Sequence, residues 1–138
     1  MTETRNVILF SAGEHESATL QRILSEHASL VSVSTLPELL DFLKNNDCDA
    51  VFCGWTHHTD TWRTVLELLQ IRYPNLPVIV FHRTGGEVEW IQALEAGAFD
   101  LLVPPYLKGT VIPLLEHAVA TRDARRWHNG GEQKGIEA

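Results

Sequence analysis

Short apolar runs alternate with longer amphipathic stretches along the chain. Five runs have the length of strands and are rich in β-branched or aromatic residues; they lie near 7–10, 30–33, 49–55, 77–81 and 99–103. Between them, apolar residues recur at the three- and four-residue spacing of a helix that covers a core. Strands that alternate with helices predict one parallel sheet with helices on both faces.

The run 49–55 is central to this prediction because it is apolar on both faces of a strand, as expected in the middle of a parallel sheet. For a chain of 138 residues we expect a flavodoxin-like α/β fold, a three-layer (βα)5 sandwich with strand order 2-1-3-4-5. Ligands of such sheets bind beyond the carboxyl ends of the strands. Gly54, Trp55 and the loop after them should therefore stand at the functional edge.

Local signals mark several helix ends. Thr35 followed by Glu38 is the pattern of a capping box, and Thr84 followed by Glu87 predicts a second one. Gly97 follows a helical stretch at the position where a left-handed cap is expected.

The helix after the second capping box carries Val88, Ile91 and Leu94 at helical spacing, and we expect these three side chains in the core. Trp90 is offset from them and should face outward, which makes it an interface candidate because tryptophan is enriched in contact patches. Trp62 shares the apolar stripe of the preceding helix and is expected to be buried.

The last helix is expected to begin near Thr110, with Pro113 tolerated in its first turn. From Trp127 onward the residues are polar, contain glycines and show no periodicity. The sequence therefore predicts one folded domain over 5–126 and a polar, flexible tail over 127–138.

Composition excludes several classes of protein. The formal net charge is -7, and the 11 Lys and Arg residues are not clustered, so no direct nucleic-acid binding is expected. Cys48 and Cys53 form no disulfide framework, which favours a reducing, cytoplasmic location. No apolar stretch is long enough to cross a bilayer, so we expect no membrane association.

The order of elements and the residues at their ends resemble the receiver domain of bacterial response regulators, of the chemotaxis-regulator type. The most specific part is the run 93–102, Ala-Leu-Glu-Ala-Gly-Ala-Phe-Asp-Leu-Leu, which leads into Pro104-Pro105-Tyr106. The resemblance also suggests that the Pro104–Pro105 peptide is cis, as the family's Lys-Pro bond is.

Carried over position by position, the resemblance implies that the family's phosphorylation pocket is degenerate here. The family's Mg2+-holding acidic pair falls on Ser11 and Ala12, and its phosphoryl-accepting Asp falls on Gly54. Its hydroxyl residue falls on His82, its lysine on Pro104 and its switch aromatic on Leu101. Such a chain has neither an oxygen site for Mg2+ nor a nucleophile nor a cation for the phosphoryl group. We therefore expect no cofactor.

The resemblance thus implies an atypical pseudo-receiver that acts in two-component signal transduction without a phosphorelay step. It would be a protein-interaction or dimerisation module rather than an enzyme. Its partner would be a protein or an effector domain, or a second copy bound through the fourth helix, fifth strand and fifth helix. Trp90 and Tyr106 are the interface candidates on that surface.

The alternative is a sensor that binds a ligand or a metal in the emptied pocket at the carboxyl edge. His57, His58 and His82 all belong to loops predicted at that edge, and imidazoles are ligands for zinc, nickel or copper. Their spacing matches no metal motif, so we expect packing or solvated histidines rather than a metal site.

Overall fold

A computed structural model describes residues 5–11, 14–55, 61–83 and 86–137, with the side chains of 14–17, 61 and 126–137 left out of the description. Ala12, His57, His58 and Thr84, all named above, lie outside the described residues.

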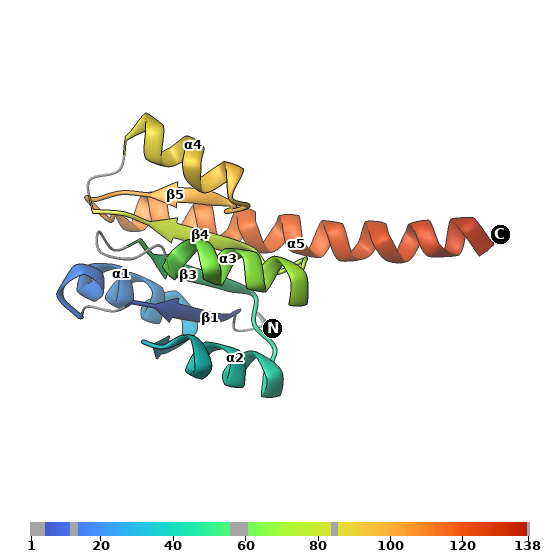
Figure 1. Cartoon of the computed structure of the whole chain (residues 1–138), viewed down its shortest axis with the longest axis horizontal. Coiled ribbons are helices and arrows are strands. Elements are labelled where there is room, and N and C mark those ends of the chain that lie inside the picture. Colours follow the sequence, from blue (N-terminus) through green and yellow to red (C-terminus); the bar gives the residue numbers. More distant parts are fainter. Residues whose placement is uncertain (1–4, 12–13, 56–60, 84–85, 138) are drawn as a thin grey trace.

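The sheet has five parallel strands, as predicted (Figure 1). They are β1 (Arg5–Phe10), β2 (Ala28–Val33), β3 (Ala50–Gly54), β4 (Val78–Phe81) and β5 (Asp100–Leu102). Their order is β2-β1-β3-β4-β5, which confirms the flavodoxin-like α/β fold. The apolar run in the middle of the chain is indeed the central strand, and β3 is buried along its length except at Gly54.

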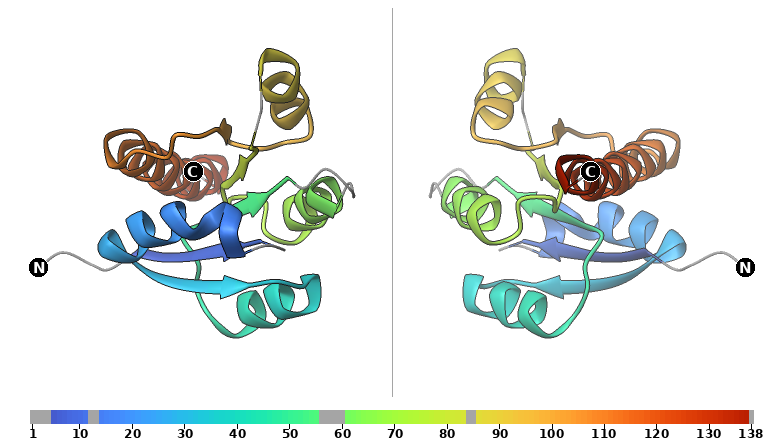
Figure 2. Two further views of the ribbon diagram at one scale, coloured as in Figure 1. Left: turned by 90° about the vertical axis from the view of Figure 1, so that its left-hand side faces the viewer. Right: turned by 90° about the vertical axis from the view of Figure 1, so that its right-hand side faces the viewer.

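Helices cover both faces of this sheet (Figure 2). The five helices are α1 (Glu14–His27), α2 (Leu36–Asn45), α3 (Thr61–Arg72), α4 (Glu87–Glu95) and α5 (Lys108–Glu137). Two cores result because side chains alternate across each strand. Val7 and Leu9 pack toward α1 and α5, whereas Ile8 and Phe10 pack toward α2 and α3.

Several local predictions are confirmed. The Thr35 hydroxyl accepts a hydrogen bond from the Glu38 amide at 3.3 Å and donates one to the Glu38 carboxylate at 3.1 Å. Gly97 has a φ of 107°, a conformation that side chains with a β-carbon rarely adopt. Trp62 is 1% exposed. The Pro104–Pro105 peptide is cis.

The predictions for α4 were wrong in two ways. The helix begins at Glu87 after Gly86, so Glu87 cannot complete a capping box, and it is the Glu89 carboxylate that accepts from the Gly86 amide at 3.2 Å. Val88 is 64% exposed and Ile91 42%, whereas Ala93 is fully buried. The helix packs against β5 at the border of the sheet through Ala93, and Val88 and Ile91 face outward.

The end of the chain also differs from expectation. α5 begins at Lys108, so Pro113 lies inside the helix rather than in its first turn. The backbone stays helical to Glu137, where the lack of periodicity had predicted no regular structure. Glu, Gln and Lys are good helix formers, which favours this continuation despite the glycines. Figure 1 shows the last turns of α5 projecting from the body of the domain. Within the described residues, none of the helices combines the length and apolarity that a membrane span requires.

Candidate functional site

Three of the predicted pocket positions meet at the carboxyl edge of the sheet. Ser11, Gly54 and His82 follow or end β1, β3 and β4. The strand register connects these ends: Phe10 pairs with Cys53, Gly54 pairs with Phe81, and the Trp55 amide donates to the Phe81 carbonyl at 2.9 Å. The strand register therefore brings together the positions that the sequence had assigned to one pocket.

Aromatic side chains occupy this edge. The ring of Trp55 stacks on Trp62, with centroids 4.4 Å apart and planes at 28°, and meets the His82 ring edge-on at 4.6 Å. His82 is only 5% exposed. The histidine considered as a metal ligand thus packs in an aromatic cluster of Trp55, Trp62 and His82. Sequence reasoning had placed Trp55 at the functional edge, but no spacing rule links it to His82.

Gly54 stands where the strand most closely approaches Phe81. A β-carbon at this position would lie 3.0 Å and 3.2 Å from two carbons of the Phe81 ring. The Phe81 ring is itself held edge-on to Tyr106, with centroids 6.4 Å apart. A side chain at position 54 would therefore require the packed Phe81 ring to shift by a few tenths of an ångström.

The remaining pocket positions offer no charge. Leu101 is half-buried and packs against the core on the α2 and α3 side, and Pro104 is exposed after β5. A proline side chain supplies no cation at the place where the resemblance expects a lysine.

The part of the chain that the structure describes offers few side chains that could bind a metal ion together. No group of three or more His, Cys, Asp and Glu side chains there is arranged to hold a metal ion. Cys53 is fully buried, and burial raises the pKa of its thiol to about 12, which disfavours the thiolate that would bind a metal.

A second candidate surface lies on α4 and the segment that follows β5. Among the described residues six large apolar side chains are exposed, and five of them fall on this surface. We call this set the α4 surface; its members are Val88, Trp90, Ile91, Val103 and Leu107.

The two interface candidates differ in their surroundings. Trp90 is 45% exposed, and its indole Nε1 donates to the Asp100 carboxylate at 2.9 Å, which fixes the ring beside β5. Tyr106 is half-buried and packs on Phe81. Trp90 is thus accessible at the surface, whereas Tyr106 mainly contributes to the core. Val88 and Ile91 were expected in the core because an apolar stripe has the same spacing whether a core, a partner or solvent covers it.

Comparison with known proteins gave matches at the level of structure only. No protein-family model matches the sequence, and no curated protein matches it either. Among solved structures, a response-regulator receiver domain protein from Clostridium thermocellum superposes with a TM-score of 0.75 at 18% identity, covering 87% of this chain and 98% of that one.

Two further structures give the same result. The beryllofluoride-activated NtrC4 receiver domain dimer has a TM-score of 0.73 at 20% identity and covers 85% of this chain and 98% of that one. NtrX from Brucella abortus in complex with ATP has a TM-score of 0.81 at 18% identity and covers 92% of this chain. The match spans only 29% of the NtrX chain. Two of these three neighbours are named as receiver domains, and the likeness establishes the fold.

Proposed function

We propose that the chain is a receiver-like module of two-component-type signal transduction that works by protein interaction without being phosphorylated. In this proposal it is not an enzyme, it uses no Mg2+, and its α4 surface binds a protein partner. Self-association through that surface is the form that can be tested directly. The fold of its neighbours supports the signalling class, and the site chemistry supports the independence from phosphorylation.

The observation that carries the proposal is the α4 surface. Exposed apolar side chains scattered singly are normal, but clustered ones mark interaction sites. Five of the six large ones in the described part lie on α4 and the segment after β5, within residues 88–107. Trp90 is held in place by its bond to Asp100 and gives this surface a rigid aromatic anchor of the kind that dominates interfaces.

The carboxyl edge supports the second part of the proposal. Phosphoryl transfer depends on a nucleophile and on positive charge that neutralises the transferred group. Position 54 has no side chain, and position 104 has no cation. Instead, the aromatic rings of Trp55, Trp62 and His82 pack together at the edge where β3 and β4 end.

Charge gives the partner a chemical character. α4 carries Glu87, Glu89 and Glu95 and no basic residue. An apolar surface rimmed by carboxylates favours a partner surface that is apolar and basic. In a symmetric dimer the two acidic α4 helices would therefore not face each other. Each α4 would instead contact a positively charged region of the other copy.

The test is a comparison of Ile91→Glu with Ile71→Glu. Both residues are exposed and apolar, but Ile71 lies on α3 outside the α4 surface. The mass in solution is measured by sedimentation over a range of concentrations. We expect the unaltered chain to dimerise, Ile91→Glu to weaken dimerisation by at least about tenfold, and Ile71→Glu to leave it unchanged.

A chain that remains monomeric at high concentration would overturn the self-association form of the proposal. Equal effects of the two substitutions would show that dimerisation does not use the α4 surface. Circular dichroism of both variants checks that the fold persists, which is expected because both side chains point into solvent.

A further inference from the structure

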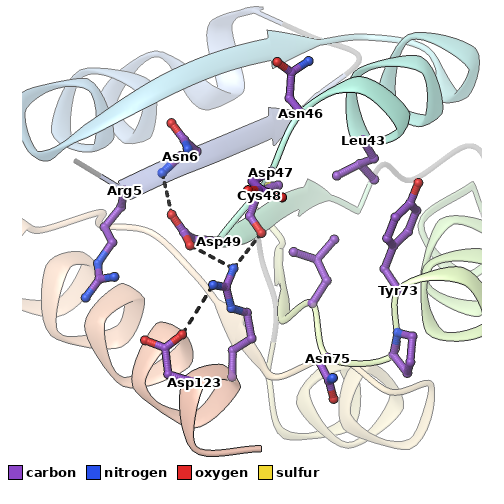
Figure 3. A pocket seen from close by; sticks show the side chains of 13 residues that line it. Arg5, Asn6, Leu43, Asn46, Asp47, Cys48, Asp49, Tyr73, Asn75 and Asp123 are labelled. Atoms are coloured by element: carbon purple, nitrogen blue, oxygen red, sulfur yellow. Dashed lines mark hydrogen bonds and ion pairs between the residues drawn. The ribbon is translucent and has the colours of Figure 1, made fainter. Parts of the chain in front are cut away.

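The amino edge of the sheet, opposite the aromatic cluster, holds a pocket of about 530 Å3 (Figure 3). It lies where the starts of β1 and β3, the end of α2, the turn after α3 and the body of α5 come together. A volume of this size is in the range that binds small molecules. Every residue that lines it belongs to the described part of the chain.

One wall of this amino-edge pocket is a fixed set of charges. The Arg122 guanidinium lies 2.8 Å from the Asp49 carboxylate and donates to the Cys48 carbonyl at 2.8 Å. The other Asp49 oxygen accepts from the Asn6 amide at 2.8 Å. Arg122 and Asp49 neutralise each other, although the buried Arg122 Nε has no hydrogen-bond partner among the described residues. We therefore assign the pair a role in shaping the pocket and assign ligand binding to other charges.

Two further charges at the pocket are uncommitted. Arg5 and Asp47 both line it and are both exposed, and neither forms an ion pair or side-chain hydrogen bond with another residue in the described part of the chain. Arg5 offers donors that suit a carboxylate, and Asp47 offers acceptors that suit an ammonium group. A ligand with one group of each kind would complement both.

The other side of the pocket is less polar. Leu43 is 6% exposed, and Tyr73 and Leu76 are half-buried. In Figure 3 Tyr73 lies on the side away from Arg5, with Asp47 between them in the view. The lining thus changes from guanidinium and carboxylate to aromatic and aliphatic surface across the pocket.

We propose that the amino-edge pocket binds a zwitterionic molecule with the chemistry of an α-amino acid that bears an apolar side chain. Its carboxylate pairs with Arg5, its ammonium group with Asp47, and its side chain packs on Tyr73 and Leu76. Ligand sites combine a few placed polar groups with apolar surface in this way.

The pocket also borders α5. Arg122 and Asp123 line it from α5, just before that helix leaves the body of the domain (Figure 1). A ligand held by Arg5, Asp47 and Tyr73 would therefore lie beside the Arg122–Asp49 ion pair that ties α5 to the sheet. This inference does not depend on the α4 surface, because the two sites share no residue.

The experiment is an NMR titration of the full chain with L-phenylalanine and with L-leucine. We expect saturable shifts of the amides near Asp47 and Leu76, with a dissociation constant on the order of 1 mM or tighter. N-acetyl-phenylalanine lacks the ammonium group and phenylalanine amide lacks the carboxylate. Each derivative should bind at least about tenfold more weakly.

Single substitutions test whether Arg5 and Asp47 are the residues that bind the two charged groups of the ligand. Arg5→Gln and Asp47→Asn should each weaken binding about tenfold, and Arg5→Lys, which keeps the cation, should retain more of it. Arg22→Gln and Asp41→Asn make the same changes of charge at exposed positions outside the pocket and should have no effect.

Absence of saturable shifts with both amino acids would overturn the proposal. Equal binding of the parent amino acid and its two derivatives would also overturn it, since the pocket would then recognise only the apolar part. Neither result would bear on the mass measured for Ile91→Glu, so failure here and failure of the proposed function are distinguishable.

Discussion

The guanidinium of Arg122 on α5 lies 2.8 Å from the carboxylate of Asp49, which immediately precedes β3. The two side chains are 12% and 16% exposed, so both charges are largely removed from water. Each also bonds to the main chain, through the Cys48 carbonyl and the Asn6 amide. This ion pair therefore ties the last helix to the amino edge of the sheet.

Arg122→Met should destabilise the fold because it leaves the Asp49 carboxylate half-buried without its partner. We expect a loss of about 2 kcal/mol in the free energy of unfolding, between the values for exposed and fully buried pairs. Urea denaturation measures it. Arg125→Met on the exposed side of α5 is the control and should change stability by less than about 0.5 kcal/mol. Equal losses in the two variants would contradict the role of the pair.

Gly97 and Gly109 should respond in opposite directions to alanine. Gly97 has a φ of 107°, which strains any residue with a β-carbon, and that carbon would also meet the Gln70 side-chain amide, so Gly97→Ala should cost at least about 1 kcal/mol. Gly109 lies in α5 with nothing within 4 Å of the added carbon. Gly109→Ala should therefore stabilise by roughly 0.5–1 kcal/mol. Melting temperatures of the two variants decide between these signs.

The sequence predicted the fold because its signals were local. A buried run such as 50–54, a cap such as Thr35 with Glu38, and Gly97 each carry their meaning within a few residues. Their order along the chain then limits a parallel sheet to few topologies. The same rule puts the ends of β3 and β4 at one edge of the sheet, so the proximity of Gly54 and His82 could be anticipated.

What could not be predicted depends on contacts between distant residues. The apolar stripe of α4 indicated a core, but hydrophobicity alone does not say what covers a surface. The packing of Ala93 on the sheet shows which side of the helix faces inward. No local pattern links Arg122 to Asp49. The amino-edge pocket depends on this pair and on five separate elements, so sequence reasoning missed it.

The two cysteines should be unreactive in the folded protein. Burial raises the pKa of both thiols to about 12, and for Cys48 a bond from the thiol to the Ala50 carbonyl offsets part of that effect. Little thiolate is present at pH 8, so an aromatic disulfide reagent should react slowly in buffer and rapidly in urea. Rapid reaction of the folded chain would contradict the full burial of Cys53 and the raised thiol pKa of the partly buried Cys48.

The same shifts predict a loss of stability at high pH. A raised pKa means that the folded state binds its thiol protons more tightly than the unfolded state, in which the thiol pKa is 9.0. Their contribution is complete below pH 9 and is lost as the pH rises from 9 toward 12. The melting temperature should fall in that window, and Cys48→Ala/Cys53→Ala should flatten the fall. An unchanged slope in the double variant would contradict this cause.

The last prediction concerns the carboxyl edge. Gly54→Asp restores a carboxylate at the end of β3, yet its β-carbon would press on the Phe81 ring at 3.0 Å. We therefore expect the variant to be less stable than the unaltered chain by about 1–3 kcal/mol, as for other overpacked sites. Gly54→Ala, which adds only the β-carbon, is the control for this steric cost.

Neither the unaltered chain nor Gly54→Asp should accept a phosphoryl group. A carboxylate at position 54 would still lack a lysine at Pro104 and the acidic residues at Ser11 and Ala12, so no metal or cation would neutralise the developing charge. Intact-mass measurement after incubation with acetyl phosphate and Mg2+ should show no added phosphoryl mass in either protein. An adduct on the unaltered chain, mapped by peptide analysis, would restore an ordinary phosphorelay role. An adduct only on Gly54→Asp would show that the missing nucleophile alone silences the pocket.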